Sequence, residues 1–138
     1  MEVDFTTCLV FNTRMAARAV TRRYDGLLRP YGVTSAQFSL IGGIKRGEGQ
    51  TVTELAERNG IDRTSLTRNL DRLEAMGLIA SHPAAKGNAR VCDLTAEGEA
   101  LVTRLVPLWV EAQAEMRELL SATDFSTTLD VLKRLSRV

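Results

Sequence analysis

The hydrophobic positions of the chain recur mainly at helical spacing. Between Gly60 and Gly77 the apolar residues fall at i, i+4 and i+7, the pattern of a helix that buries one stripe. Asp62 is a good N-cap, and Gly77 suits the left-handed position after a last helical turn. The pattern predicts a helix over residues 63–76. Its buried stripe consists of Leu66, Leu70 and Leu73.

Five further segments have helical patterns. The first covers residues 4–29 and is ended by Pro30. Capping boxes, Thr34 with Gln37 and Thr51 with Glu54, open helices over residues 35–44 and 52–59. Residues 46–49 are predicted to form a loop. The last two helices run from Thr95 through Leu119, with a bend at Pro107, and from Ser121 through Leu135.

Two short segments alternate apolar and polar residues as strands do, residues 78–80 and 90–94. A connection containing Pro and Gly, SHPAAKGNA, joins them, so we expect a β-hairpin. Before the hairpin come a short helix, a turn at Gly60 and a longer helix, which together make a helix-turn-helix. The predicted fold class is therefore mainly α, with a winged helix-turn-helix. An ordinary surface hairpin is the alternative to a wing.

The helix over residues 63–76 turns polar side chains away from its leucine stripe. At about 100° per residue, Thr64, Ser65, Arg68, Asp71 and Arg72 lie opposite the stripe, and Arg63 and Thr67 lie at its borders. Hydroxyl groups allow close approach to DNA, and a guanidinium group can bind guanine or phosphate. This face favours DNA binding. The alternative is an ordinary solvated face.

Composition fits one globular domain of 138 residues with 44% hydrophobic residues and a formal net charge of +1. The charge is uneven, because residues 58–92 alone carry a net +3. The apolar run near the start, residues 8–11, is too short for a signal peptide or a membrane span. We therefore expect a cytoplasmic protein that does not enter a membrane.

Residues for catalysis or metal binding are sparse. The one histidine, His82, stands beside Pro83 near the predicted wing, and the two cysteines form no CxxC pair. No nucleophile motif or phosphate-binding loop is present. Three glutamates at helical spacing are more typical of a solvated face than of a metal site. They are Glu111, Glu115 and Glu118. The sequence thus predicts no enzyme, catalytic residue, metal or cofactor.

The chain resembles the MarR family of winged-helix transcriptional regulators along nearly its whole length. The matching stretches are LLRPYGVTSAQFSLI, TVTELAERNGIDRTSLTRNLDRLEAMGLI and VCDLTAEGEAL. The resemblance implies a single unit over residues 1–138, with a winged helix at 34–96 and dimerisation helices at 1–30 and 97–138. It also implies a homodimer that binds a palindromic operator in double-stranded DNA, with repression as the leading expectation. Release would follow binding of a small molecule or an oxidant.

The predicted wing departs from the family in one respect. Where the family usually has an Asp-x-Arg tip, this chain has Lys86-Gly87-Asn88, and Arg90 follows two residues later. We therefore expect the wing to contact phosphates through Lys86 and Arg90. The expected DNA contacts are Arg63, Thr64, Ser65, Thr67, Arg68, Arg72, Lys86, Asn88 and Arg90. The altered tip also motivates an alternative, a dimeric protein-interaction module without specific DNA binding.

Two features concern the effector. The resemblance implies a pocket for small aromatic compounds, for which Phe11, Tyr24, Phe38 and Trp109 are candidates, although such aromatics are also ordinary core residues. Cys8 stands where some related peroxide sensors carry a reactive cysteine. Cysteine is also a common small buried hydrophobe, so the sensor and packing interpretations of Cys8 both stay open.

Overall fold

Helices dominate the computed structural model, which describes residues 1–47 and 50–138. The predicted loop at 46–49 includes residues 48 and 49, which lie outside the described residues. The described chain divides into two units, Met1–Phe38 and Ser39–Val138. A mainly helical fold with one small antiparallel sheet confirms the predicted fold class. The single unit over residues 1–138 stays a prediction.

The first unit begins later as an α-helix than the sequence pattern predicts. The Asp4 carboxylate accepts hydrogen bonds from the backbone N–H and the hydroxyl of Thr6, which favours a 3₁₀ turn, η1, at Phe5–Thr7. Cys8 then has an extended backbone, with ψ of 125°. The helix α1 therefore covers Leu9–Leu28, and the predicted start at residue 4 is wrong.

The end of α1 follows the prediction. A 3₁₀ turn, η2, covers Arg29–Tyr31, and Gly32 has a φ of 76°, which a residue without Cβ adopts readily. The predicted capping box is present, because Thr34 N–H donates to Gln37 Oε1 at 3.0 Å and Gln37 N–H donates to Thr34 Oγ1 at 3.1 Å. It opens α2, Ser35–Arg46, whose later residues belong to the second unit.

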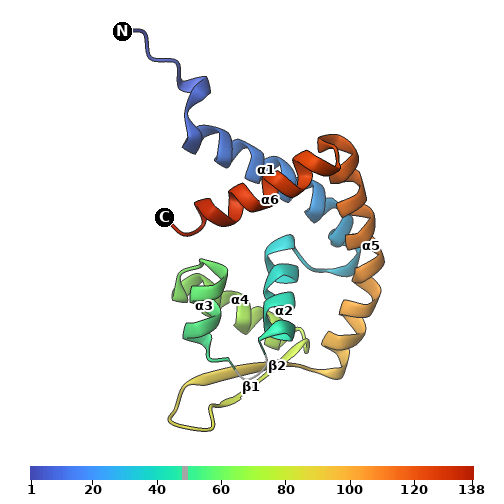
Figure 1. The fold of residues 1–138 in the computed structure, drawn as a ribbon. Helices are drawn as coiled ribbons and strands as arrows, with labels where there is room; N and C mark the ends of the chain where they lie inside the picture. The colour runs from blue at the N-terminus through green and yellow to red at the C-terminus, as the bar shows by residue number, and fades with distance from the viewer. Residues whose placement is uncertain (48–49) are drawn as a thin grey trace. The chain divides into compact units, whose positions relative to one another are not determined.

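The second unit continues with α3 at Val52–Asn59 and α4 at Arg63–Ala75. The strands β1 and β2, Ile79–Pro83 and Arg90–Leu94, form the predicted hairpin, followed by α5 at Ala96–Leu120 and α6 at Ala122–Leu135 (Figure 1). The predicted first strand, residues 78–80, is too short. It extends because Ser81, His82 and Pro83 pair with Cys92, Val91 and Arg90.

The core of the second unit contains the predicted leucine stripe of α4, since Leu66, Leu70 and Leu73 are all fully buried. Each such side chain contributes about 1.5 to 3 kcal/mol to folding. Apolar residues of the other elements complete this core. They include Leu40, Ile41, Ile44, Leu55, Ile79, Val91, Leu101 and Leu105.

Both units keep apolar surface on their long helices, as the sequence predicts. In the first unit the exposed apolar residues include Phe5 in η1 and, on α1, Leu9, Val10, Phe11, Met15 and Val20. In the second they include Val106, Trp109, Val110, Leu119, Leu129 and Leu132. Pro107 lies inside α5, which is assigned as one helix. Among the described helices, none combines the length and apolar character that a membrane span requires.

A close backbone contact at Gly98 joins α5 to the short segment between α4 and β1. Thr95 N–H donates to the carbonyl of Leu78 at 3.1 Å, and Thr95 Oγ1 donates to the carbonyl of Gly77 at 2.6 Å. The same Oγ1 accepts from Gly98 N–H at 3.1 Å. A Cβ on Gly98 would lie 2.1 Å from the Leu78 carbonyl oxygen, closer than any real contact. A residue without a side chain is therefore required there.

We predict that Gly98→Ala lowers the free energy of unfolding by about 1 to 3 kcal/mol, because the backbone of Leu78 must move away. Gly26→Ala is the matched control, since nothing lies within 4 Å of its Cβ position in α1. The control should raise the free energy of unfolding by about 0.5 to 1 kcal/mol through helix propensity. Urea unfolding of both variants measures the difference, and equal stability would contradict the close contact.

Candidate nucleic-acid interface

The turn between α3 and α4 is fixed by caps on both sides. Gly60 ends α3 with a φ of 60°, and its N–H donates back to the last carbonyls of that helix. Asp62 begins α4, because its Oδ1 accepts from Ser65 N–H at 2.9 Å. Hydrogen bonds from the backbone and side chain of Ser65 lower the pKa of Asp62, so this cap is ionised at neutral pH. The direction of α4 is thus set at its first turn.

The outer face of α4 carries the polar residues predicted for it. Arg63, Thr64, Thr67, Arg68 and Arg72 are exposed, whereas Ser65 is half-buried beside the cap. The leucine stripe on the opposite side is fully buried, so the helix cannot rotate to present another face. Three guanidinium groups and two hydroxyl groups therefore lie together on one accessible helical surface.

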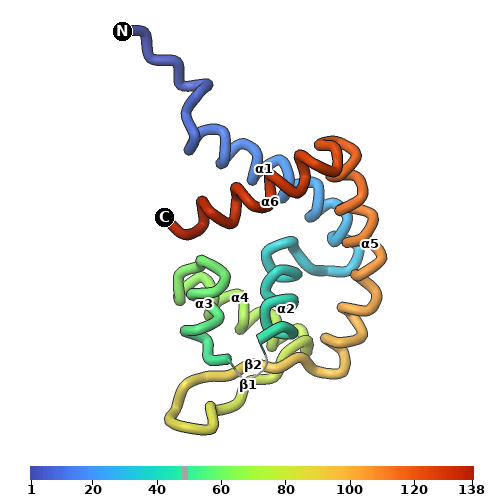
Figure 2. The backbone as a smooth tube through the Cα atoms, viewed as in Figure 1, coloured from blue at the N-terminus to red at the C-terminus, as the bar shows by residue number. Residues whose placement is uncertain are grey.

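The hairpin carries the second part of the candidate interface. Ala84 N–H donates to the carbonyl of Ala89 at 2.7 Å and closes the loop, in which Gly87 has a φ of 80°. Lys86 and Asn88 are exposed in this loop. The loop projects beyond the helices of the second unit (Figure 2). Its side chains are therefore accessible to a partner.

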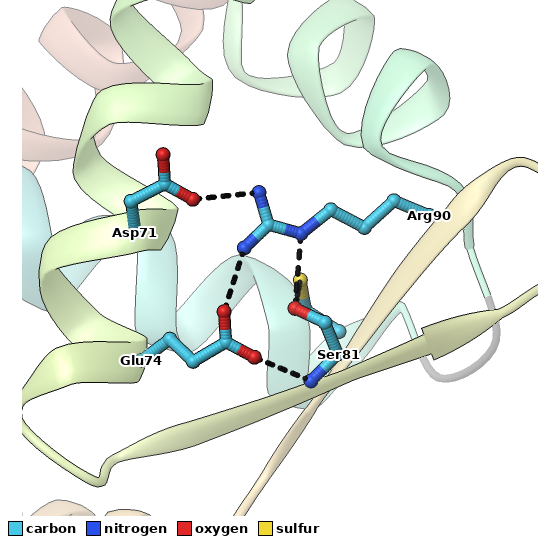
Figure 3. A network of polar contacts seen from close by, with 5 residues as sticks. Asp71, Glu74, Ser81 and Arg90 are labelled. Carbon is cyan, nitrogen blue, oxygen red and sulfur yellow. Dashed lines mark hydrogen bonds and ion pairs between the residues drawn. The ribbon is translucent and has the colours of Figure 1, made fainter.

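Arg90 uses each of its three side-chain nitrogens, two to bind α4 and one to bind β1 within the hairpin (Figure 3). Its Nη1 donates to Asp71 at 2.9 Å and its Nη2 to Glu74 at 3.2 Å. Its Nε donates to Ser81 Oγ at 2.9 Å. The other carboxylate oxygen of Glu74 accepts from Ser81 N–H at 3.0 Å. Four residues from α4, β1 and β2 thus form one polar network, named here the Arg90 network.

The Arg90 network changes the interpretation of Arg90. Its side chain is only 27% exposed, and its guanidinium group is already bound within the chain. Burial alone lowers the pKa of Arg90, but hydrogen bonding to Asp71 and the nearby carboxylates raise it overall, so the group stays charged. A contact between Arg90 and DNA stays a prediction. The structure shows instead that Arg90 forms ion pairs with two carboxylates of α4, whose combined charge it offsets in part, and holds the hairpin to that helix.

Sequence reasoning missed the Arg90 network, although a signal was present. Asp71 and Glu74 are separated by three residues, so both carboxylates point along the same edge of α4. The strand register shows that a cation lies next to that edge. It places Ser81 opposite Cys92, and Arg90 precedes Cys92 by two residues on β2. The hairpin register was not predictable from a loop of that length.

The remaining candidate residues are spread over the two units. Cys8 is half-buried just before α1, and Cys92 is buried in β2. Phe11, Tyr24 and Phe38 belong to the first unit and Trp109 to the second, so the pocket formed by the four aromatics stays a prediction. Among the described residues, no cluster of His, Cys, Asp or Glu could hold a metal ion.

Hollows are found among the described residues of each unit, and the two described next are not lined by those aromatics. One, of about 330 Å³, is lined by Asp25, Arg29, Gly32, Val33 and Thr34. The other, of about 410 Å³, lies beside the base of the hairpin and is lined by Ile44, Lys45, Asp93, Leu94 and Glu99. Both are open, and the second is the more polar.

Comparison with known proteins identifies the fold. The family model described as "MarR family" matches residues 31–87. The M. tuberculosis transcriptional regulator MosR, solved in complex with DNA, is 37% identical over 94% of each chain, with a TM-score of 0.84. A second MosR structure is 36% identical over 97% of this chain and 96% of that one, with a TM-score of 0.85.

A more distant structure agrees with this assignment. A mutant of MarR from E. coli, complexed with operator DNA, is 25% identical over 97% of this chain and 99% of that one, with a TM-score of 0.86. The chain therefore belongs to the MarR family of winged-helix transcriptional regulators.

Proposed function

We propose that this protein is a sequence-specific DNA-binding transcriptional regulator that acts as a homodimer on a palindromic operator. In this proposal α4 enters the major groove and the hairpin contacts the flanking backbone. Lys86 and Asn88 contact phosphates, and the leading expectation is repression. The proposal rests on similarity to a regulator solved with DNA and on the surface of α4 itself.

The observation that carries the proposal is the outer face of α4. Its exposed residues include Thr64, Arg68 and Arg72, while the three leucines behind them are fully buried. Arg68 is near the middle of this face, where a recognition helix comes closest to base edges. Because Asp71 and Glu74 are held by Arg90, their charges repel phosphates less than free carboxylates would.

Dimerisation is supported by apolar surface in each unit. Phe5 is 71% exposed in the first unit, and Leu119 and Leu132 are 75% and 50% exposed in the second. Contiguous exposed apolar surface marks interaction sites in soluble proteins, and exposed large apolar residues recur along the long helices of both units. A second copy of the chain is the proposed partner, because two symmetric recognition helices match a palindrome.

The effector is the least specified part of the proposal. A small aromatic compound near Phe11, Tyr24, Phe38 and Trp109 is one candidate. An oxidant acting on Cys8, at the start of α1, is the other. Either effector must act differently on the conformation that binds DNA and the conformation that does not. An effector that affects both conformations equally cannot release DNA.

Selection of duplexes from a random-sequence pool tests the proposal. The protein should enrich a palindrome whose half-site centres are about one helical turn apart. Affinity for that duplex should exceed affinity for random duplex by about 10³-fold or more at physiological salt. If no sequence is enriched, the alternative function, a dimeric protein-interaction module without specific DNA binding, is favoured. The altered hairpin tip is the feature that motivates this alternative.

We predict that Arg68→Ala weakens binding to the selected duplex about 5- to 150-fold, the loss expected for one base-contacting Arg. The fold should persist, because Arg68 is exposed. Arg104→Ala, which removes an exposed Arg from α5, is the matched control and should bind as wild type does. Fluorescence anisotropy measures both affinities. Unchanged binding by Arg68→Ala would show that α4 does not contact the bases as proposed.

For Lys86→Ala we predict a different result, a similar loss of affinity on selected and random duplexes. A phosphate contact carries no sequence information, and its removal should reduce the slope of log affinity against log salt by about 1. Titrations at several salt concentrations measure this slope. An unchanged slope would place Lys86 away from the DNA backbone.

The dimer is tested by Leu132→Asp on α6, which we predict to shift the protein towards monomer at micromolar concentration. A charge on an exposed apolar side chain opposes its burial against a partner. Thr127→Asp is the matched control, since this exposed residue lies about 140° away around the same helix. Sedimentation equilibrium should give a dimer for the control, and a wild-type monomer would contradict the proposal.

A further inference from the structure

His82, the chain's one histidine, lies on β1 in the hairpin with its side chain half exposed. Its Nε2 contacts a carboxylate oxygen of Asp93 on β2. Its Nδ1 lies 3.1 Å from the carbonyl oxygen of Pro83. The imidazole ring therefore connects the two strands and also contacts the end of β1, where the loop begins.

Both atoms that face the ring are hydrogen-bond acceptors. A peptide carbonyl only accepts, and an ionised carboxylate only accepts. Each ring nitrogen must then carry a proton for both hydrogen bonds to form, and only the imidazolium form has two N–H groups. With neutral imidazole, one of the two contacts loses its hydrogen bond. Both contacts of His82 are therefore satisfied together only by the protonated ring.

The partners of the ring favour the same form, although cations also lie in the surrounding elements. The first of these partners is Asp93, and the hydrogen bonds to Asp93 and to the Pro83 carbonyl raise the pKa of His82. Asp93 lines the polar hollow together with Lys45 from α2 and Glu99 from α5, which bind each other at 2.6 Å. The Arg90 network joins α4 to the neighbouring hairpin residues, and Lys86 lies in the loop.

The raised pKa of His82 determines how its contribution to stability changes with pH. A histidine whose pKa is higher in the folded protein than in the unfolded chain stabilises the fold most at low pH. The stabilisation is fully present below the ordinary histidine pKa of about 6.5 and is lost as pH rises through the raised value. Over the same range the charge of the His82–Asp93 pair changes from zero to −1.

We propose that His82 is a proton switch in the wing, which strengthens DNA binding at acidic pH and weakens it at alkaline pH. The inference rests on the proposed function. Two effects act in the same direction. Deprotonation removes a positive charge from a hairpin that faces phosphates and leaves the charge of Asp93 uncompensated. It also removes one of the two hydrogen bonds that the ring makes to the strands.

The first measurement uses the free protein and does not depend on DNA. Because the chain has one histidine, the imidazole resonances in its NMR spectrum come from His82 alone and report its titration. We expect a midpoint above the ordinary value in wild type, and a lower midpoint in Asp93→Asn, which removes the carboxylate. Asp130→Asn is the matched control, since it removes an exposed carboxylate from α6, and should leave the midpoint unchanged. A wild-type midpoint at or below the ordinary value would overturn the inference.

The second measurement is affinity for the selected duplex between pH 6 and pH 8.5 at constant ionic strength. We expect wild-type affinity to fall about fivefold, at the low end of typical coupling between sites because the pair is exposed and screened. His82→Gln, which cannot titrate, should show a nearly flat profile, whereas Asp130→Asn should follow wild type. A pH dependence identical in wild type and His82→Gln would overturn the proton switch. Absence of specific binding at every pH would instead contradict the proposed function.

Discussion

Burial of the leucine stripe of α4 is the constraint on which the rest of the structure depends. This stripe, formed by Leu66, Leu70 and Leu73, is fully buried in the folded second unit. Its burial contributes several kcal/mol to the stability of the unit. With one face of α4 fixed inside the core, the opposite face must point outward. The positions of Thr64, Arg68 and Arg72 on the surface are thus a consequence of packing.

The hairpin depends on α4 in turn. A two-stranded hairpin is marginal alone, so β1 and β2 need support from other elements. Ile79 and Val91 supply apolar support in the core, and the Arg90 network supplies polar support at the surface. The network thus joins the two proposed DNA-contacting elements, α4 and the hairpin, to each other. The Thr95 and Gly98 contacts then connect these elements to α5.

Elements with local signals were predictable, whereas features that depend on strand register were not. Capping residues such as Asp62 fix helix starts through hydrogen bonds within three residues, and the leucine spacing fixes the buried face of α4. The first helix was predicted to begin too early because Asp4, a capping residue, caps a 3₁₀ turn instead of an α-helix. The length of β1, the partners of Arg90 and the contact between His82 and Asp93 all follow from which hairpin residues stand opposite each other. A loop with several small residues permits more than one strand register, so the sequence does not show which residues lie next to Arg90. Arg90 was therefore predicted to contact DNA because of its place in the hairpin.

The charges of the two proposed DNA-contacting elements differ in kind. The guanidinium groups of α4 stay protonated throughout the physiological pH range, so their attraction for phosphate is constant. In the hairpin, Arg90 is neutralised by its carboxylate partners, while Lys86 remains exposed in the loop. Deprotonation of His82 changes the net charge of the His82–Asp93 pair by one elementary charge. This change is large relative to the charge of the hairpin and small relative to the charge of the α4 guanidinium groups. A titrating pair thus alters backbone contacts by the wing more than base contacts by the recognition helix, and affinity can respond to pH while sequence preference is retained.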